Sequence, residues 1–129
     1  MKLQTLVAAV LLCVALVPMA ALDAAPLQPM MRGWERYFSL DWSTATYQGR
    51  PVVYGHVRNE WGVTAANARL LVEGIDEQGQ IASQTIGWLG TQLTPGTTAT
   101  FEVPVTARAP QYRVSVFAFD WVQRGRGPN

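Results

Sequence analysis

Apolar and polar residues alternate along most of this chain, as in strands that are buried on one face only. Two alternating runs, residues 52–58 and 66–75, are joined by a polar turn and followed by a second turn. Side chains that alternate with a period of two point to opposite faces of a sheet. The segment therefore predicts two antiparallel strands, with Asn59, Asp76 and Gly79 as turn-forming residues.

The same pattern recurs on both sides of this segment. The further alternating runs are 34–47, 80–89, 97–105 and 112–122. Between two of them, Pro95 and Gly96 indicate a turn, because proline presets φ and glycine accepts a positive φ. Beyond the N-terminus, no segment has a sustained helical period. The pattern predicts an all-β fold, an antiparallel immunoglobulin-like β-sandwich of six to seven strands.

The N-terminus follows a different pattern. Lys2 precedes an apolar run over residues 3–17, and small residues cluster at 20–25, which is typical of a signal peptide. Residues 1–25 are therefore expected to form a signal helix, although the cleavage position stays open. An uncleaved anchor is the alternative, because the apolar stretch is about long enough to cross a bilayer. The expected location is periplasmic or secreted, or membrane-anchored if the segment is retained.

Length and composition fit one globular domain. The chain has 129 residues, of which 49% are hydrophobic, and a formal net charge of +1. This charge argues against a nucleic-acid partner, which needs a basic surface. The expected organisation is an extended arm at 26–33, the sandwich at 34–122 and a flexible tail at 123–129. Cys13, the single cysteine, lies in the signal segment, so no disulfide framework is expected in the domain.

The residue types needed for catalysis or metal binding are sparse. His56 is the only histidine and lies within an expected strand, without a nucleophile motif nearby. Asp76 and Glu77 are adjacent in a turn, and no acidic loop has calcium spacing. We therefore expect no catalytic residues, no metal site, no cofactor and no enzymatic activity.

The last strand departs from the alternation. If the even-numbered residues of 112–118 face the core, then Phe117, Phe119 and Trp121 lie together on the opposite face. Such an aromatic face is unexpected on a solvated sheet. Four explanations remain open. The arm covers the face, a second copy or a protein partner binds it, sugar rings stack on it, or a β-bulge shifts the register and removes it.

The order of turns and strands resembles the FxLYD family of bacterial and archaeal extracytoplasmic domains. The resemblance spans residues 38–119 and is carried by Gly55-x-Val57-x-Asn59, Asp76-x-x-Gly79 and Leu93-x-Pro95-Gly96-x-x-x-x-Phe101. The family motif itself would fall on residues 72–76, where only Asp76 is retained. The resemblance implies an immunoglobulin-like sandwich, export from the cytoplasm and no established activity.

These observations predict an exported, non-enzymatic interaction or structural module. The candidate binding residues are Phe117, Phe119 and Trp121, with Trp61 and Trp88 as secondary candidates. The expected partner is another protein or a second copy of the chain. The alternative is a carbohydrate-binding module that uses the same aromatic residues to bind a polysaccharide.

Overall fold

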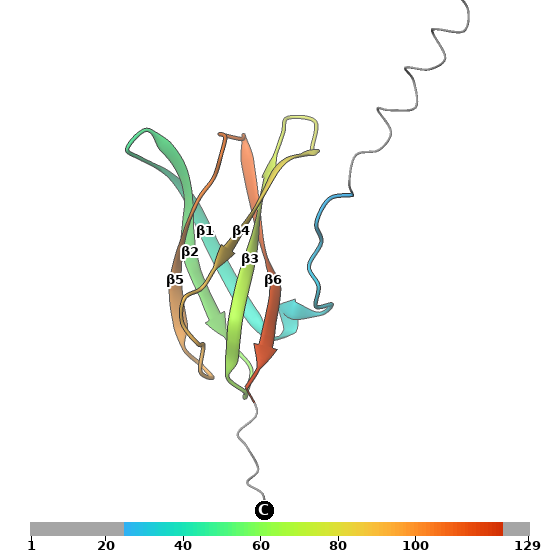
Figure 1. Ribbon diagram of the computed structural model, residues 1–129, viewed down its shortest axis with the longest axis vertical. Coiled ribbons are helices and arrows are strands. Elements are labelled where there is room, and N and C mark those ends of the chain that lie inside the picture. Colours follow the sequence, from blue (N-terminus) through green and yellow to red (C-terminus); the bar gives the residue numbers. More distant parts are fainter. Residues whose placement is uncertain (1–24, 123–129) are drawn as a thin grey trace, which may run out of the picture.

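A computed structural model of the chain describes residues 25–122, which form six strands in two antiparallel sheets (Figure 1). The strands are β1 (Phe38–Tyr47), β2 (Arg50–Asn59), β3 (Ala65–Ile75), β4 (Ile81–Trp88), β5 (Thr98–Pro104) and β6 (Gln111–Trp121). The first sheet has the order β1-β2-β5 and the second has the order β4-β3-β6. The prediction of an all-β antiparallel fold is confirmed. Residues 1–24 of the predicted signal helix, and the predicted tail at 123–129, lie outside the described residues.

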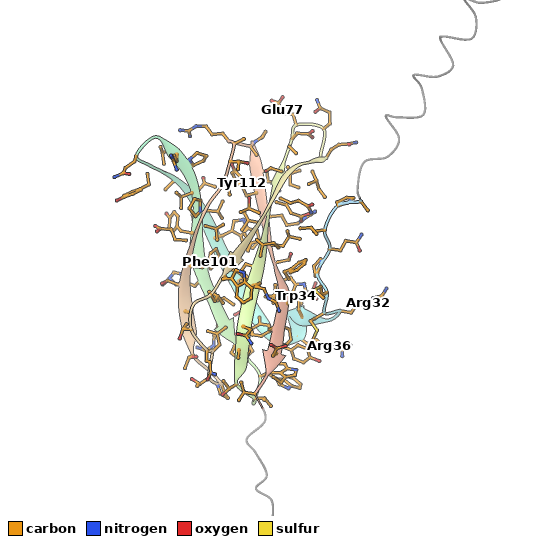
Figure 2. All side chains as sticks on the ribbon, viewed as in Figure 1. Arg32, Trp34, Arg36, Glu77, Phe101 and Tyr112 are labelled. Atoms are coloured by element: carbon orange, nitrogen blue, oxygen red, sulfur yellow. The ribbon has the colours of Figure 1, made fainter. Side chains whose placement is uncertain are left out.

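The core lies between the two sheets and takes side chains from both of them. Val53 and Val57 of β2 are almost fully buried, as are Leu70 of β3 and Val116 of β6. Figure 2 shows the side chains that fill this space, with Phe101 of β5 among them. Each of these residues lies on the face that the alternation predicts, because a strand with one buried face repeats every two residues.

The structure corrects the predicted start of the first strand. The sequence pattern predicts a strand from residue 34, but Trp34–Arg36 form the short 3-10 helix η3. Gly33 precedes it with φ 78°, a left-handed conformation that glycine adopts readily. The amide of Tyr37 then donates to the Trp34 carbonyl at 2.9 Å, which closes the turn. The extended conformation therefore begins only at Phe38.

The N-terminal arm lies along the outer face of the second sheet (Figure 1). The amide of Leu27 donates to the Gln84 side chain at 2.9 Å, and that side chain donates back to the Leu27 carbonyl at 3.0 Å. The amide of Met30 donates to the Phe117 carbonyl at 2.8 Å. The geometry thus agrees with one of the four explanations, in which the arm covers this face of the sheet.

A buried carboxylate orients the side chain that holds the arm. Glu73 is only 5% exposed on β3, and its carboxylate accepts hydrogen bonds from Gln84 and from the Arg113 guanidinium, both at 2.9 Å. A buried charge needs such partners, because the loss of hydration is costly. Arg113, Glu73, Gln84 and Leu27 therefore form one continuous chain of hydrogen bonds from β6 to the arm.

The tyrosine at the start of β6 closes the connection from β5. The hydroxyl of Tyr112 donates to the Ala107 carbonyl at 2.7 Å and accepts from the Ala109 amide at 2.9 Å. Its own carbonyl accepts from the Trp42 indole at 3.0 Å. Tyr112 therefore joins β6, the β5–β6 connection and the edge strand β1.

We predict that Tyr112→Phe destabilises the domain. The substitution leaves the ring in place but removes the partner of two backbone groups, so we expect a loss of about 1–3 kcal/mol in the free energy of unfolding. Chemical denaturation measures this change. Tyr47→Phe is the matched control, because Tyr47 is 65% exposed and should change stability by less than about 0.5 kcal/mol. Equal stability of the two variants would contradict the prediction.

The hydroxyl of Ser115, on β6, is buried and has no hydrogen-bond partner among residues 25–122. An unpaired buried polar group destabilises a fold, because it loses its bonds to water and gains none. We therefore expect Ser115→Ala to leave the free energy of unfolding unchanged or to raise it by up to about 1 kcal/mol. Thermal unfolding can test this, with the exposed Ser43→Ala as control. A clear loss of stability in Ser115→Ala alone would refute the prediction.

Candidate functional site

A β-bulge in β6 separates the aromatic residues that the sequence places on one face. Val116 pairs with Leu70 and Ala118 pairs with Arg69, so Phe117 is an additional residue between consecutive pairs. A bulge of one residue moves all following side chains to the opposite face. Phe119 consequently packs in the core and is only 3% exposed. The expectation that Phe119 belongs to an outward aromatic face is therefore wrong.

The five candidate aromatic residues lie in three different environments. Phe117 is half-buried beside the arm, and Trp121 is half-buried against the core. Trp61 is 45% exposed in the β2–β3 loop, and Trp88 is 64% exposed at the end of β4. The structure thus brings Trp61 and Trp121 together, whereas Phe117 and Trp88 lie elsewhere.

Trp61 and Trp121 belong to a cluster of contacting aromatic rings. Tyr37 packs edge-on against Trp61, with ring centres 4.7 Å apart, and against Trp121, with ring centres 5.3 Å apart. Phe119 contacts Trp121 edge-on at 4.7 Å, and Phe38 lies parallel to Trp121 at 6.0 Å. Edge-on and offset rings attract each other beyond the area that they bury. Both tryptophan rings are therefore held in place before any ligand arrives.

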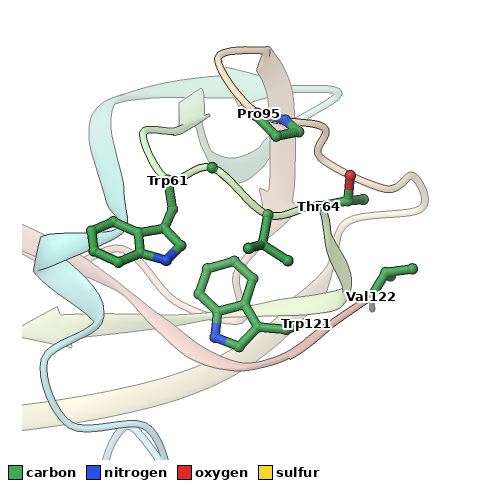
Figure 3. A pocket seen from close by; sticks show the side chains of 7 residues that line it. Trp61, Thr64, Pro95, Trp121 and Val122 are labelled. Atoms are coloured by element: carbon green, nitrogen blue, oxygen red, sulfur yellow. The ribbon is translucent and has the colours of Figure 1, made fainter. Parts of the chain in front are cut away.

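These two tryptophans line an open cleft of about 470 Å³ at one end of the molecule. Figure 3 shows Trp61 at one side of the cleft and Val122 at the other, with Trp121 between them. The remaining wall is formed by Gly62, Val63, Thr64 and Pro95. The cleft thus combines the β2–β3 loop, the β4–β5 connection and the end of β6, and no charged side chain among residues 25–122 lines it.

The side chain of Asn59 holds the two connections of the cleft together. Its amide nitrogen donates to the carbonyls of Val63 and Leu93, both at 2.9 Å, and its oxygen accepts from the Trp61 amide at 2.8 Å. The Asn59 backbone also pairs with Gly96 and Thr97. Asn59 is fully buried, so its side chain must find all of its partners within the protein.

The other turn residues named from the sequence lie in tight turns. Asp76 accepts the amides of Gln78 and Gln80 at 2.9 and 2.8 Å, and Gly79 adopts φ 79°. Pro95 and Gly96 are the central residues of a turn closed by the bond from the Thr97 amide to the Thr94 carbonyl. Gly96 has φ 77° there, which suits the third position of a type II turn. Pro95 is both a turn residue and a wall of the cleft.

No metal-binding cluster of histidine, cysteine or carboxylate side chains occurs within residues 25–122. His56 lies on the exposed outer face of the first sheet, with its Nδ1 atom 2.9 Å from an Asp41 carboxylate oxygen. In the same part of the chain, no helix has the length and apolar character needed to span a membrane.

We compared the chain with family models, curated proteins and solved structures, and none of them matches it. The resemblance to FxLYD domains therefore stays a prediction. A functional proposal must therefore be based on the geometry of the described residues.

Sequence reasoning missed Tyr37, on which the cleft depends, and only part of the role of Asn59 follows from it. Tyr37 interrupts the polar side of the alternation in residues 34–47, and this interruption is the available signal for a ring that contacts both tryptophans. The sequence predicts Asn59 as a turn residue, but its bond to Leu93 crosses 34 positions of sequence. A local pattern carries no information about such a distant partner.

We predict that Asn59→Ala destabilises the domain and loosens the cleft. The substitution removes three buried hydrogen bonds, so the free energy of unfolding should fall by about 2–3 kcal/mol. Below the unfolding temperature, the amide of Trp61 should also exchange with solvent faster, because its acceptor is lost. Denaturation and amide hydrogen exchange measure these effects. The exposed Gln92→Ala provides the control, and wild-type exchange at Trp61 in Asn59→Ala would show that the side chain does not hold the loop.

Proposed function

We propose that this chain is an exported, non-enzymatic binding module that recognises a protein partner through the cleft lined by Trp61 and Trp121. The observation that carries the proposal is a half-exposed tryptophan held in a preformed aromatic cluster, at the mouth of a cleft that no charged side chain of residues 25–122 lines. Tryptophan is enriched among the residues that dominate binding energy in protein interfaces. A ring that is already held in place loses little conformational freedom on binding.

The chemistry of the cleft favours an apolar segment of a protein as the ligand. Its side-chain walls are mainly indole, valine and proline, and their polar groups are the Thr64 hydroxyl and the indole N–H groups of Trp61 and Trp121. A volume of about 470 Å³ can accept one or two apolar side chains. A sugar at this place would leave most of its hydroxyl groups without side-chain partners. The cleft therefore supports a protein ligand better than a polysaccharide.

The strand order supports an immunoglobulin-like sandwich as the finer description of the fold. If β1 corresponds to strand A, the two sheets read A-B-E and C′-C-F. Tyr112 lies at the start of strand F, and its hydroxyl bonds back to the preceding connection, as in the tyrosine corner of immunoglobulin-like domains. These domains place their loops at the two ends of the sandwich, where many of them bind their partners. The cleft occupies such an end.

Export is the second component of the proposal, and it rests on the pattern of residues 1–25. A basic start, an apolar run and a cluster of small residues are typical of a secretory signal. The proposed location is the periplasm or the exterior, with a membrane-anchored form as the alternative if the segment is retained. The resemblance to FxLYD domains supports the same location.

Site-specific photo-crosslinking can test the proposal. With a photoreactive benzophenone amino acid at Thr64, on the wall of the cleft, irradiation of the producing cells should yield one defined adduct with another protein. The same amino acid at Glu102, exposed on β5, should give none. Trp61→Ala should reduce the adduct at Thr64 by about tenfold or more, because an interface tryptophan commonly contributes about 2 kcal/mol or more.

Trp88→Ala is the matched control, since it removes an exposed tryptophan that does not line the cleft. The adduct at Thr64 should be unchanged in this variant. Circular dichroism and thermal unfolding establish that both variants are folded. The proposal fails if Thr64 yields no adduct, or if Trp61→Ala and wild type give the same yield.

A further inference from the structure

Trp88 is a second exposed tryptophan, in surroundings unlike those of the cleft. It lies at the end of β4 with 64% of its surface exposed. The guanidinium of Arg69, which is paired with it across the sheet, lies 4.8 Å from the ring centre. A cation over one face of an indole is held by the charge distribution of the ring. Arg69 thus orients the indole, and the high exposure leaves ring surface open to solvent.

A short series of hydrogen bonds leads from Arg69 across β3 to β6. The Arg69 side chain donates to the carbonyl of Asn67 at 3.1 Å. The amide nitrogen of Asn67 donates in turn to the Asp120 carboxylate at 2.9 Å, and both of these groups are exposed. A guanidinium, an amide and a carboxylate together offer several donors and acceptors in fixed planes. They form one connected network, of which Arg69 contacts the indole and Asn67 lines the same hollow as Trp88.

An irregularity of the backbone creates this arrangement. Ala66 pairs with Asp120 and Arg69 pairs with Ala118, so β3 contains one more residue than β6 over this interval. Asn67 lies at this bulge with φ 54°, a left-handed conformation that only a few residue types other than glycine tolerate. Bulges and left-handed residues of this kind are frequent at functional sites, where they redirect side chains.

A shallow hollow adjoins the network. It measures about 260 Å³ and is lined by Asn67 and Trp88 together with Thr91 and Gln92 of the following connection. It therefore combines one large flat apolar surface with hydroxyl and amide groups. The cleft of Trp61 differs in its side chains, which are mainly indole, valine and proline.

We propose that the hollow beside Trp88, lined also by Asn67, Thr91 and Gln92, is a binding site for a neutral saccharide. The C–H groups on one face of a pyranose ring are apolar and can cover the exposed indole surface. The hydroxyl groups at the edge of the ring can then bond to the side chains of Asn67, Thr91 and Gln92. The site is independent of the protein-binding cleft, since Trp88 and Asn67 do not line that cleft.

Charge and shape favour this ligand over the other classes. The chain carries a net charge of only +1, and an acidic side chain belongs to the network, so a polyanion such as nucleic acid is disfavoured. A protein partner would require more apolar surface than one tryptophan in a shallow hollow provides. A ring with one apolar face and a polar edge matches both components of the site.

Isothermal titration calorimetry on the exported protein can test the site, with cellotetraose, maltotetraose and N-acetylglucosamine tetramer as probes. At least one of them should bind to wild type. Trp88→Ala should lower its affinity by at least about tenfold, because it removes the stacking surface. Asn67→Gly should weaken binding several-fold without unfolding, because glycine accepts the left-handed backbone and only the amide is lost.

Trp61→Ala serves as the reciprocal control, and saccharide affinity should be the same as in wild type. The inference is overturned if none of the three oligosaccharides binds at millimolar concentration, or if Trp88→Ala binds them as tightly as wild type does. It is also overturned if Trp88→Ala abolishes the protein adduct at Thr64, because Trp88 would then belong to the protein interface. Failure of the cleft proposal alone would leave the calorimetric result unaffected.

Discussion

The fully buried side chain of Asn59 is the constraint on which one end of the molecule depends. Its amide group connects the end of β2 to the β2–β3 loop and to the β4–β5 connection. Backbone groups in such loops cannot be left unpaired beneath a surface. One asparagine therefore satisfies them and also holds the two connections that carry Trp61 and Pro95, both of which line the cleft. The stability of this end and the shape of the cleft have the same physical origin.

Bulges in the second sheet determine which side chains face the core and which face solvent at this end of the molecule. The additional residue in β6 turns Phe119 into the core, and the additional residue in β3 places Asn67 beside Trp88. Each shift is a local loss of regular pairing, which costs stability. The aromatic cluster around Tyr37 and Trp121 offsets part of this cost, because it is packed only in the shifted register.

Most of the fold could be predicted from the sequence, because alternation directly reports which face of a strand is buried. The burial of Val53 and Val57, and the turn at Pro95–Gly96, follow from local residue patterns. The inward position of Phe119 does not, because a bulge depends on the pairing with β3 and leaves the local pattern unchanged. The cleft could not be predicted from the sequence either. Its residues Trp61, Pro95 and Trp121 are distant in sequence and are brought together only by the fold.

The contrast between Trp61 and Trp88 shows why exposed aromatic residues should be judged by their neighbours and not by exposure alone. Trp61 is supported by another aromatic ring beside mainly apolar side chains, whereas Trp88 is supported by a guanidinium beside a hollow with amide and hydroxyl groups. The first site has few polar side-chain groups to desolvate, so an apolar ligand loses few hydrogen bonds to water there. Desolvating the second site would leave its polar groups without hydrogen bonds unless the ligand replaces their bonds to water. The two sites therefore select chemically different ligands on one small domain.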